Sequence, residues 1–370
     1  MAPEPLRVLI AGGGTGGHIY PALAIGSELK SRYGAQLLFV GTARGLESRL
    51  VPQAGYRLEL IRVGQLNQVS LKTRLKTLVD LPAGFLQCLG LLHKFRPHVV
   101  IGVGGYASGP VMGAAILRGI PTLAFEPNAV PGMANRLVGR RVSAAAVNFA
   151  PAMKFFRNPQ VTGIPVRAEF FQLAPRPAGA APRLLVFGGS QGARILNNAL
   201  PQIVPSLLEQ VPRLTILHQA GARHVESTLA AYQASGAPPD GWQVAPFLDD
   251  MPRQFEAADL VLARSGGSTV AELCAAAKPA LLVPFALAAD DHQRGNAEVM
   301  AQAGAAQVLL EANLTPEHLL AGLCGLLSDP PRLQQMAASA RTLAHPDAAE
   351  RIGAMAMALA KPQQFSPQSG

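Results

Sequence analysis

Short apolar runs alternate with helical patterns along the first half of the chain. The first run begins at Arg7, and a helical pattern over Ile19–Tyr33 is closed by Gly34. A second helical pattern, amphipathic and basic, covers Leu71–Phe95. Further short runs predict strands at Gln36–Val40, Tyr56–Arg62, Val99–Val103, Thr122–Phe125, Ala144–Val147 and Gln160–Val161.

The same alternation returns in the second half. Helices are predicted from about Ala193 and over Thr269–Ala277. Strands are predicted at Leu184–Phe187, Leu214–Gln219, Trp242–Pro246, Asp259–Ala263 and Ala280–Pro284. Strands that read as continuous apolar blocks between helices indicate parallel sheets covered on both faces.

The two halves begin alike. RVLIAGGGTGG starts at Arg7 and RLLVFGGSQGA starts at Arg183, and each places an apolar strand before a glycine-rich turn. We therefore expect an α/β protein with two Rossmann-like, doubly wound parallel-sheet domains whose loops face a shared cleft. The segment Gly163–Ala181, rich in Pro, Ala and Gly, marks the boundary.

This boundary predicts an N-terminal domain over residues 1–165 and a C-terminal domain over residues 166–344. The remaining residues, 345–370, are expected to form a helix that packs back on the N-terminal domain, followed by a frayed tail.

Composition narrows the class of protein. Hydrophobic residues make up 49% of the 370 residues and charged residues 15%, which suits buried cores and excludes a disordered chain. The net charge of +9 suggests an anionic partner. Three cysteines without a C-x-x-C pair indicate a reducing compartment. Glycines interrupt the apolar run Val99–Leu117, so we expect neither a transmembrane helix nor a signal peptide.

Glycine clusters follow several predicted strands, at residues 12–17, 102–105, 188–192 and 265–268. Such loops turn backbone N–H groups and a helix N-terminus toward an anion, although each could also be a tight turn alone. Together they favour phosphate chemistry.

The first cluster meets the dinucleotide pattern G-x-G-x-x-G at Gly12, Gly14 and Gly17. A nicotinamide enzyme would need an acid after the second strand, where this chain reads GTAR at 41–44. Arg44 leaves a 2′-phosphorylated cofactor open. The sequence has no Walker loop, which argues against a P-loop NTPase.

The sequence RSGGSTVAEL follows the predicted strand Asp259–Ala263. Ser268 or Thr269 is expected to cap a helix whose N-terminus faces an anion. Glu272 lies at helical spacing from both, where it could accept the two hydroxyls of a ribose or simply complement the helix dipole.

Several motifs together resemble one family. They are GGGTGGHIYPALA near the start, VGGYASGP at 103–110, GGSQGAR at 188–194, FLDDM at 247–251 and RSGGSTVAE at 264–272. In this order and spacing they resemble the MurG family within glycosyltransferase family 28. The resemblance implies a GT-B fold and an inverting, metal-independent transfer of N-acetylglucosamine (GlcNAc) from UDP-GlcNAc to lipid I. The products would be lipid II and UDP, in bacterial peptidoglycan synthesis.

The resemblance also implies site residues. Arg167, Ser190, His292 and Gln293 would contact the donor, Leu248 the uracil, and Asn128 the sugar. The donor segment would be Gly267, Ser268, Thr269, Val270, Ala271 and Glu272. The first loop would meet the donor sugar and the acceptor through Thr15, Gly16 and Gly17. The acceptor diphosphate would lie at Gly14, Gly104, Gly105 and Tyr106.

The chain departs from the family pattern at Phe125, Pro127 and Ile164, where the family commonly has His, Gln and Asn. Any side-chain role in the family at these positions is therefore in question here.

Inverting transfer needs a base for the acceptor hydroxyl and stabilisation of the leaving diphosphate. His18 is the candidate base, because a helix N-terminus disfavours the imidazolium form. It could equally bind a phosphate or a sugar hydroxyl. Glu126 is the rival base. The sequence contains no Asp-x-Asp motif, which would indicate a metal-dependent transferase. No metal and no cofactor are expected.

The helical stretch from Leu71 to Arg96 is expected to dock on the anionic inner leaflet. The contact residues would be Lys72, Arg74, Leu75, Lys76, Leu78, Val79 and Arg140. Its periodicity alone also fits an ordinary helix packed on the sheet. The implied location is peripheral, on the cytoplasmic face of the bacterial inner membrane, with other cell-wall synthesis proteins as possible partners.

Two other functions compete with the transferase. One is an NADP-linked oxidoreductase that uses the first loop. The other is a non-catalytic protein that binds nucleotide sugars or nucleic acid. Aromatic residues make up 5% of the chain and are not interleaved with basic ones, so nucleic acid is not an expected partner.

Overall fold

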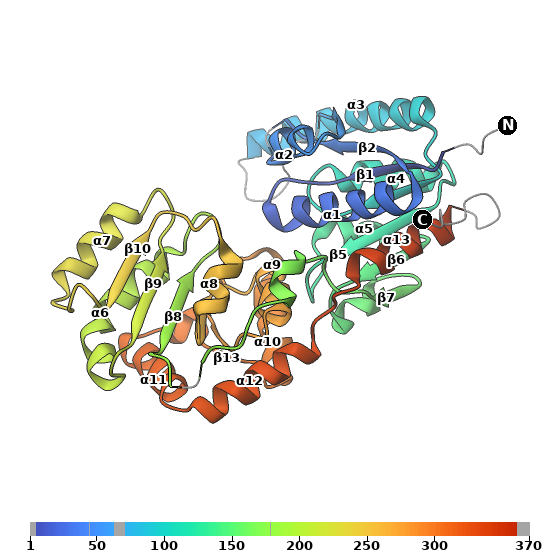
Figure 1. The fold of residues 1–370 in the computed structure, drawn as a ribbon. Helices are drawn as coiled ribbons and strands as arrows, with labels where there is room; N and C mark the ends of the chain where they lie inside the picture. Colours follow the sequence, from blue (N-terminus) through green and yellow to red (C-terminus); the bar gives the residue numbers. More distant parts are fainter. Residues whose placement is uncertain (1–4, 44, 63–70, 178, 361–370) are drawn as a thin grey trace. The chain divides into compact units, whose positions relative to one another are not determined.

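The computed structural model describes residues 5–43, 45–62, 71–177 and 179–360, and of residues 71–81 it describes the backbone alone. The chain forms two compact units: unit 1 is Met1–Pro165 with Asp347–Gly370, and unit 2 is Val166–Pro346. Each unit contains one parallel β-sheet with helices around it (Figure 1). The predicted α/β class with two Rossmann-like domains is confirmed.

Unit 1 has a seven-stranded sheet in the order β3-β2-β1-β4-β5-β6-β7. Its strands are β1 (Arg7–Ala11), β2 (Gln36–Gly41), β3 (Arg57–Leu60), β4 (Val99–Gly102), β5 (Thr122–Glu126), β6 (Ala144–Val147) and β7 (Pro159–Val161). Its helices are α1 (Gly16–Tyr33), α2 (Glu47–Gln53), α3 (Leu71–Phe95), α4 (Ser108–Leu117), α5 (Met133–Val138), the 3₁₀ helix η1 (Ala150–Phe155) and α13 (Ala348–Leu359).

Unit 2 has a six-stranded sheet in the order β10-β9-β8-β11-β12-β13. Its strands are β8 (Arg183–Phe187), β9 (Thr215–Gln219), β10 (Trp242–Ala245), β11 (Leu260–Ala263), β12 (Ala280–Leu282) and β13 (Ala306–Val308). Its α-helices are α6 (Arg194–Gln210), α7 (Val225–Ala234), α8 (Met251–Ala257), α9 (Gly267–Ala275), α10 (His292–Gln302), α11 (Pro316–Leu327) and α12 (Pro330–Thr342). Its 3₁₀ helices are η2 (Ala168–Phe171), η3 (Ala289–Asp291) and η4 (Glu311–Asn313).

The two sheets share one connection pattern, in which the strand that opens each unit lies between its second and fourth strands. The repeat seen between Arg7 and Arg183 is therefore a repeat of structure. Every predicted strand is confirmed within a residue or two. The sequence interpretation did not assign the strand β13 or the helices α2, α5, α7, α8, α10, α11 and α12. The shortest of these elements give little periodicity.

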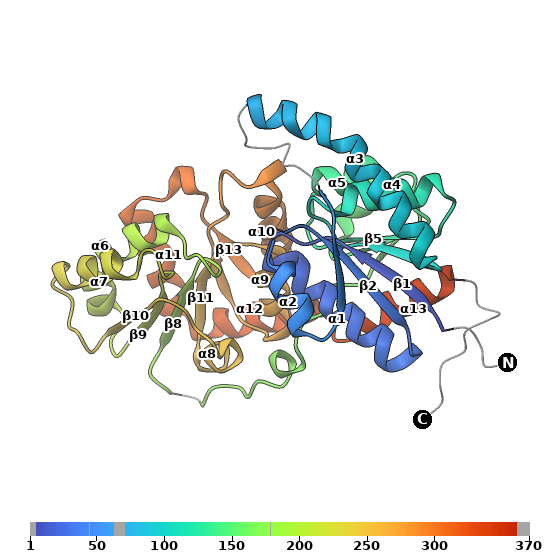
Figure 2. The same cartoon turned by 90° about the horizontal axis from the view of Figure 1, so that it is seen from above.

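Alternation along β1 builds the core of unit 1. Leu9 and Ala11 pack in a cluster with Cys88 of α3 and Val111 of α4. Val8, which points to the opposite face, is also fully buried. Both faces of the sheet are thus covered, as expected for parallel strands. Helices α3 and α4 lie side by side (Figure 2).

Helix α13 completes unit 1 from the far end of the chain. It packs against α1 and against the strands β4, β5 and β6 (Figure 1). Ile352 and Ala356 are fully buried there. An ion pair between Arg32 and Glu350, with Nη1 and Oε1 2.5 Å apart, adds a surface contact.

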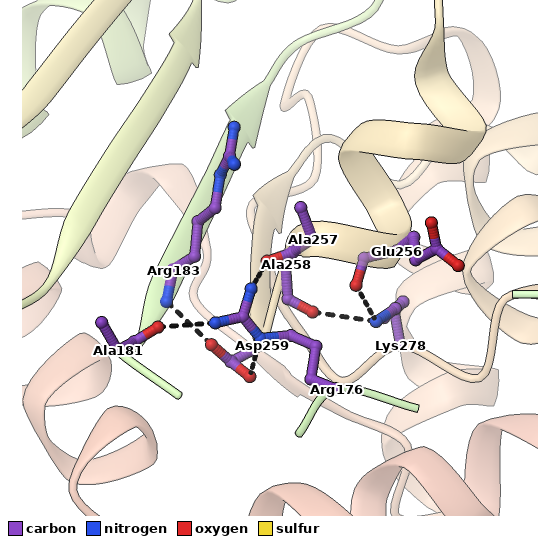
Figure 3. Close-up of polar contacts among 8 residues, drawn as sticks. All are labelled: Arg176, Ala181, Arg183, Glu256, Ala257, Ala258, Asp259 and Lys278. Atoms are coloured by element: carbon purple, nitrogen blue, oxygen red, sulfur yellow. Dashed lines mark hydrogen bonds and ion pairs between the residues drawn. The ribbon is translucent and has the colours of Figure 1, made fainter. Parts of the chain in front are cut away.

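The segment that enters unit 2 is held at the amino ends of β8 and β11 (Figure 3). Arg176 pairs with Asp259 at 2.9 Å and donates to the carbonyls of Ala181 and Ala257. Nearby, Lys278 donates to the carbonyls of Glu256 and Ala258, and burial lowers the pKa of Lys278 to about 8. These contacts lie at the opposite edge of the sheet from the glycine loops, because parallel strands share one direction.

Candidate functional site

Three loops of unit 1 meet at the carboxyl edge of its sheet. Strand β4 pairs with β1 on one side and with β5 on the other. The loops that follow these strands carry the first glycine cluster, the pair Gly104 and Gly105, and the segment around Asn128. Sheet topology therefore gathers residues that lie far apart in the sequence.

The first two loops contact each other through their backbones. The N–H of Gly13 donates to the carbonyl of Gly104 at 3.3 Å. A side chain at Gly105 would collide with the carbonyl of Gly13. Gly12, Gly13 and Gly14 have φ angles of 150°, 143° and 94°, which residues with side chains rarely adopt. The glycines here are required by geometry.

Gly14 does not offer its N–H to a ligand in this structure. That N–H donates to Oε2 of Glu47 at 2.7 Å. Glu47, the first residue of α2, is 1% exposed. The predicted contact of Gly14 with a diphosphate therefore cannot use the Gly14 N–H as it stands here.

His18 is the third residue of α1, which begins at Gly16 rather than at the predicted Ile19. Its Nδ1 lies 3.3 Å from Oγ1 of Thr15, the residue that precedes the helix. An added Cβ at Gly104 would lie 3.0 Å from Nε2 of His18, so the imidazole packs over that glycine. His18 is half-buried, and Thr15 is exposed.

Glu126 ends β5 with its side chain almost wholly buried. Its Oε1 accepts from the N–H of Asn128 at 2.9 Å and from Nδ2 of Asn128 at 3.1 Å. Its Oε2 accepts from Nδ2 of Asn135 at 2.9 Å. Burial raises the pKa of Glu126 to about 7, against these hydrogen bonds, which lower it. The carboxyl holds the loop that carries Asn128.

The departures from the family pattern are buried positions. Phe125 is fully buried in β5, and Ile164 is 3% exposed. Pro127 is buried, and its carbonyl accepts from Nδ2 of Asn148 at 3.2 Å. Apolar side chains at these three positions therefore suit their surroundings. Tyr106, by contrast, is exposed.

In unit 2 the loop after β8 is held by its neighbour β9. Nε2 of Gln219 donates to the carbonyl of Gly189 at 3.0 Å, and the Gly192 N–H donates to the same carbonyl at 2.9 Å. Ser190 between them is exposed. Beneath the loop, Asn197 donates to the carbonyl of Ala220 at 2.9 Å.

Helix α9 begins one strand further along the sheet. Its N-cap is Gly266, so the predicted cap by Ser268 or Thr269 is wrong. Gly266 has extended backbone angles and no side chain, and both hydroxyl residues lie inside the first turn. The Oγ of Ser268 is buried and has no hydrogen-bond partner in the part of the chain that the structure describes. The first turn thus leaves a hydroxyl and backbone N–H groups for a ligand.

Glu272 is the sixth residue of α9. The residue is half-buried, and burial of its carboxyl raises the pKa of Glu272 to about 7. The positive charge of Arg167 opposes that rise. Arg167 is exposed and stacks over the ring of Phe170, with 5.2 Å from the guanidinium carbon to the ring centre.

The loop after β12 is tied to the start of α9. Oγ of Ser265 donates to the carbonyl of Gln293 at 2.7 Å, and Nδ2 of Asn296 donates to the carbonyl of Ser265 at 3.0 Å. Oε1 of Gln293 accepts from the N–H of Phe285 at 3.0 Å. Nδ1 of His292 lies 2.6 Å from the carbonyl of Ala289. The predicted Gln293 and Glu272 regions are therefore neighbours.

The other predicted donor residues lie at the same sheet edge of unit 2. Leu248 is half-buried in the loop between β10 and α8. Gly267 and Val270 are buried, while Thr269 and Ala271 are half-buried on α9.

The predicted membrane residues fall largely outside the described side chains. Lys72, Arg74, Leu75, Lys76, Leu78 and Val79 lie on α3, where the structure describes the backbone alone. Arg140 is described, and its Nη2 donates to the carbonyl of Lys154 at 2.5 Å. Among the described residues, no helix has both the length and the apolar character needed to cross a bilayer.

The sequence interpretation missed the residues that hold the loops. Glu47, Asn135, Gln219 and Asn296 were not singled out. Each is a buried polar residue, and Glu47 stands in GTARGLE, which begins with the last residue of β2. A polar residue close to a glycine pair after an apolar run is the signal that could have drawn attention to Glu47.

The described residues contain no group of three or more His, Cys, Asp or Glu side chains that could hold a metal ion.

Two family domains match this chain: the glycosyltransferase family 28 N-terminal domain over residues 8–147 and the C-terminal domain over residues 183–352.

The chain is also similar to curated proteins named UDP-N-acetylglucosamine–N-acetylmuramyl-(pentapeptide) pyrophosphoryl-undecaprenol N-acetylglucosamine transferase, including the following two. The one from Anaeromyxobacter dehalogenans (strain 2CP-C) is 44% identical over 367 residues, 98% of this chain and 95% of that protein. The one from Solibacter usitatus (strain Ellin6076) is 42% identical over 356 residues, 96% of each chain. The crystal structure of Acinetobacter baumannii MurG matches with a TM-score of 0.83 at 31% identity, covering 96% of this chain and 100% of that one.

Proposed function

The chain belongs to glycosyltransferase family 28, and from this premise we propose that it makes lipid II. It is a hexosyltransferase with the GT-B fold. It transfers GlcNAc from UDP-GlcNAc to the muramyl C4 hydroxyl of lipid I (undecaprenyl-pyrophosphoryl-MurNAc-pentapeptide), and UDP is the other product. This step belongs to peptidoglycan synthesis.

The observation that carries this function is identity above 40% over nearly the full length of relatives named for the reaction. The match includes the glycine clusters of both units. The match of both halves of the chain to glycosyltransferase family 28 argues against the NADP-linked alternative.

Unit 2 is the proposed donor domain. The unpartnered hydroxyl of Ser268 and the first turn of α9 suit the diphosphate, as does the exposed Ser190. Glu272 would accept hydrogen bonds from the ribose hydroxyls. The positive charge of Arg167 favours the ionised carboxylate that accepts them. Gln293 and His292 would recognise GlcNAc, and Leu248 would meet the uracil.

Unit 1 is the proposed acceptor domain, with His18 as the base. In the tautomer whose Nδ1–H donates to Thr15, Nε2 is the atom that accepts the proton of the muramyl hydroxyl. The hydroxyl oxygen then attacks the anomeric carbon of GlcNAc, and the bond to the UDP oxygen breaks with inversion. Helix N-termini stabilise the charge on the leaving diphosphate without a metal.

Glu126 fits a different role from the base. Its carboxyl is almost wholly buried, and both oxygens are engaged by Asn128 and Asn135. We assign it to hold Asn128 toward the sugar. With the Gly14 N–H engaged by Glu47, the acceptor diphosphate would meet Gly16, Gly17, Gly104, Gly105 and Tyr106.

Docking on the anionic inner leaflet is proposed for unit 1, as a peripheral protein of the cytoplasmic face. Large apolar side chains protrude from three neighbouring helices: Leu86 on α3, Leu117 at the end of α4 and Leu137 on α5 are each about two-thirds exposed. Arg140 and Arg141 follow α5 directly. Apolar anchors beside arginines give reversible binding to anionic lipid.

Vesicle flotation tests the docking. Wild-type protein should float with anionic vesicles more than with neutral ones, and Leu137→Glu should reduce that binding. Equal flotation with both vesicle types would contradict the electrostatic part of the proposal.

The function is tested with a lipid I analogue and either UDP-GlcNAc or UDP-GalNAc. We expect the lipid II product with UDP-GlcNAc and far less product with UDP-GalNAc. A thermal shift should appear with UDP and UDP-GlcNAc and be absent with NADPH and single-stranded DNA. Stabilisation by NADPH without transfer would overturn the proposal.

The base is tested by His18→Gln at saturating donor. General base catalysis contributes on the order of 100- to 10,000-fold, so turnover should fall by that order while UDP affinity stays unchanged. The matched variant Glu126→Gln should retain more turnover than His18→Gln. Near wild-type turnover in His18→Gln would exclude it as the base.

A further inference from the structure

Glu47 is a buried carboxylate that the proposed reaction does not use. It begins α2, directly after the loop that follows β2, and β2 pairs with β1 along its length. Its side chain is 1% exposed. A carboxylate removed from water in this way must be compensated by hydrogen bonds or charge.

Three hydrogen bonds engage the Glu47 carboxylate. Oε2 accepts from the Gly14 N–H at 2.7 Å. Oε1 accepts from the Thr42 N–H and from the Thr42 hydroxyl, each at 2.9 Å. The carboxylate thus joins the first glycine loop to the segment after β2, across 33 residues of sequence.

Three glycines leave room for this carboxylate. A Cβ placed on Gly13, Gly41 or Gly45 would collide with the side chain of Glu47. Both chain segments that surround the carboxylate are therefore shaped to it. Such a fit is what a fixed anchor needs, since a loosely held group would tolerate larger neighbours.

The residue that Glu47 anchors, Gly14, lies one position before the segment that carries the proposed base. Gly14 precedes Thr15, the N-cap of α1, and Thr15 contacts Nδ1 of His18. The backbone at Gly14 has a φ of 94°, and an added Cβ there would meet nothing within 4 Å. Nothing packs against that Cβ position, and the hydrogen bond from the Gly14 N–H to Glu47 ties this residue to the segment after β2.

We propose that Glu47 is a positioning residue for the first glycine loop, fixing Thr15 and His18 for proton transfer from the acceptor hydroxyl. The proposal rests on the function assigned above to His18. Glu47 does not touch substrate. It acts by turning the Gly14 N–H inward, so that the loop reaches the start of α1 in one conformation.

Glu47→Gln is the decisive variant, because the amide is the same size but has one acceptor oxygen and one NH₂ group. Either the Gly14 N–H or the Thr42 N–H then faces a donor. Displacing a catalytic group by about 1 Å can cost roughly 100-fold in rate. We expect kcat to fall about 10- to 100-fold, with KM for UDP-GlcNAc and calorimetric UDP affinity within about twofold of wild type.

Gly45→Ala provides a second route if Glu47→Gln folds poorly. Its methyl group would overlap the present position of the Glu47 carboxylate and so displace that carboxylate without removing its charge. The same loss of kcat is expected. Gly325→Ala in α11 is the control, since its Cβ would meet nothing within 4 Å and kcat should not change.

Rates are normalised to the fraction of protein in which unit 1 is folded, measured by hydrogen-exchange protection of the buried strands β1 and β4, so a merely structural loss of folded enzyme leaves kcat unchanged. A kcat within twofold of wild type in the folded variants would overturn the positioning role. If the wild-type protein transfers no GlcNAc, the proposed function fails instead. Hydrogen exchange at the Gly14 amide then decides the anchor alone: protection in wild type that is lost in Glu47→Gln supports it, and equal exchange overturns it.

Discussion

The glycine loops after β1 and β8 follow equivalent strands, but side chains anchor them with opposite polarity. In unit 1 the buried carboxyls of Glu47 and Glu126 accept from the N–H groups of Gly14 and Asn128. In unit 2 the side chain of Gln219 donates to the carbonyl of Gly189. Two loops in equivalent positions are therefore held through different backbone groups, an N–H in unit 1 and a carbonyl in unit 2.

This difference has an electrostatic consequence. An anchor that accepts uses up a loop N–H, and it adds negative charge beneath the loop when its carboxyl is ionised. An anchor that donates engages a carbonyl and leaves the N–H groups for an anion. The loop after β8 is thus suited to the donor diphosphate, whereas in unit 1 the Gly14 N–H is engaged by Glu47 and the acceptor diphosphate would have to use other N–H groups.

The largest expected effect is on the pH dependence of the unfolding free energy, through Glu126, a hydrogen-bond-accepting anchor of unit 1. Burial raises the pKa of Glu126 from its ordinary value of 4.5 to about 7. The folded state therefore holds the proton more tightly, and this stabilisation is full below about pH 4.5 and lost as pH rises through about 7. The shift corresponds to roughly 3 kcal/mol of unfolding free energy.

Glu126→Gln should remove that contribution, because the amide does not ionise. Denaturant unfolding at pH 5 and pH 8 should show wild-type stability falling with pH and a flatter dependence in the variant. Equal slopes in the two proteins would contradict the account of Glu126 as a buried, proton-holding anchor.

A smaller effect is expected at Glu272 in unit 2, the carboxyl proposed to bind the donor ribose. Hydrogen bonds to a charged group contribute roughly 1.5–3 kcal/mol, so Glu272→Gln should lower UDP affinity by about 10- to 100-fold. Isothermal titration calorimetry measures it, with the exposed Glu226→Gln on α7 as the control. Unchanged affinity would mean that Glu272 complements the helix dipole and does not bind ribose.

The smallest effect concerns a donating anchor. Gln219→Leu leaves the carbonyl of Gly189 without its side-chain donor, which costs about 1 kcal/mol and so several-fold in UDP affinity. The exposed Gln202→Leu, whose amide bonds within its own helix, is the matched control. If Gln219→Leu instead impaired only the acceptor step, the contrast between the two loops would be wrong.

The sequence predicted the strands and glycine loops because those signals are local. Each strand is a short apolar run, and the loops of interest follow β1, β4, β8 and β11 at once. The anchors were not predictable in the same way. Glu47 meets Gly14 across 33 residues and Gln219 meets Gly189 across 30. Such pairs depend on which strands become neighbours, which periodicity does not reveal.

The prediction of the N-cap of α9 was wrong for a different reason. Ser268 and Thr269 are good capping residues, yet the helix begins earlier, at Gly267. Propensity ranks residues for a cap but does not fix where the chain leaves the strand. The hydroxyl of Ser268 that a cap would have used stays without a partner among the described residues, where a phosphate could take it.

Helix α13 makes unit 2, in chain order, an insertion within unit 1. During synthesis, unit 1 cannot complete its core until the ribosome has passed Pro346 and delivered Ile352 and Ala356 of α13. A nonsense codon just after unit 2 would therefore damage the acceptor half while sparing the donor half. Dividing the gene between Pro165 and Val166 would not yield two independent domains, because α13 of unit 1 would then be encoded with unit 2. A circular permutant that begins at Asp347 would keep unit 1 contiguous.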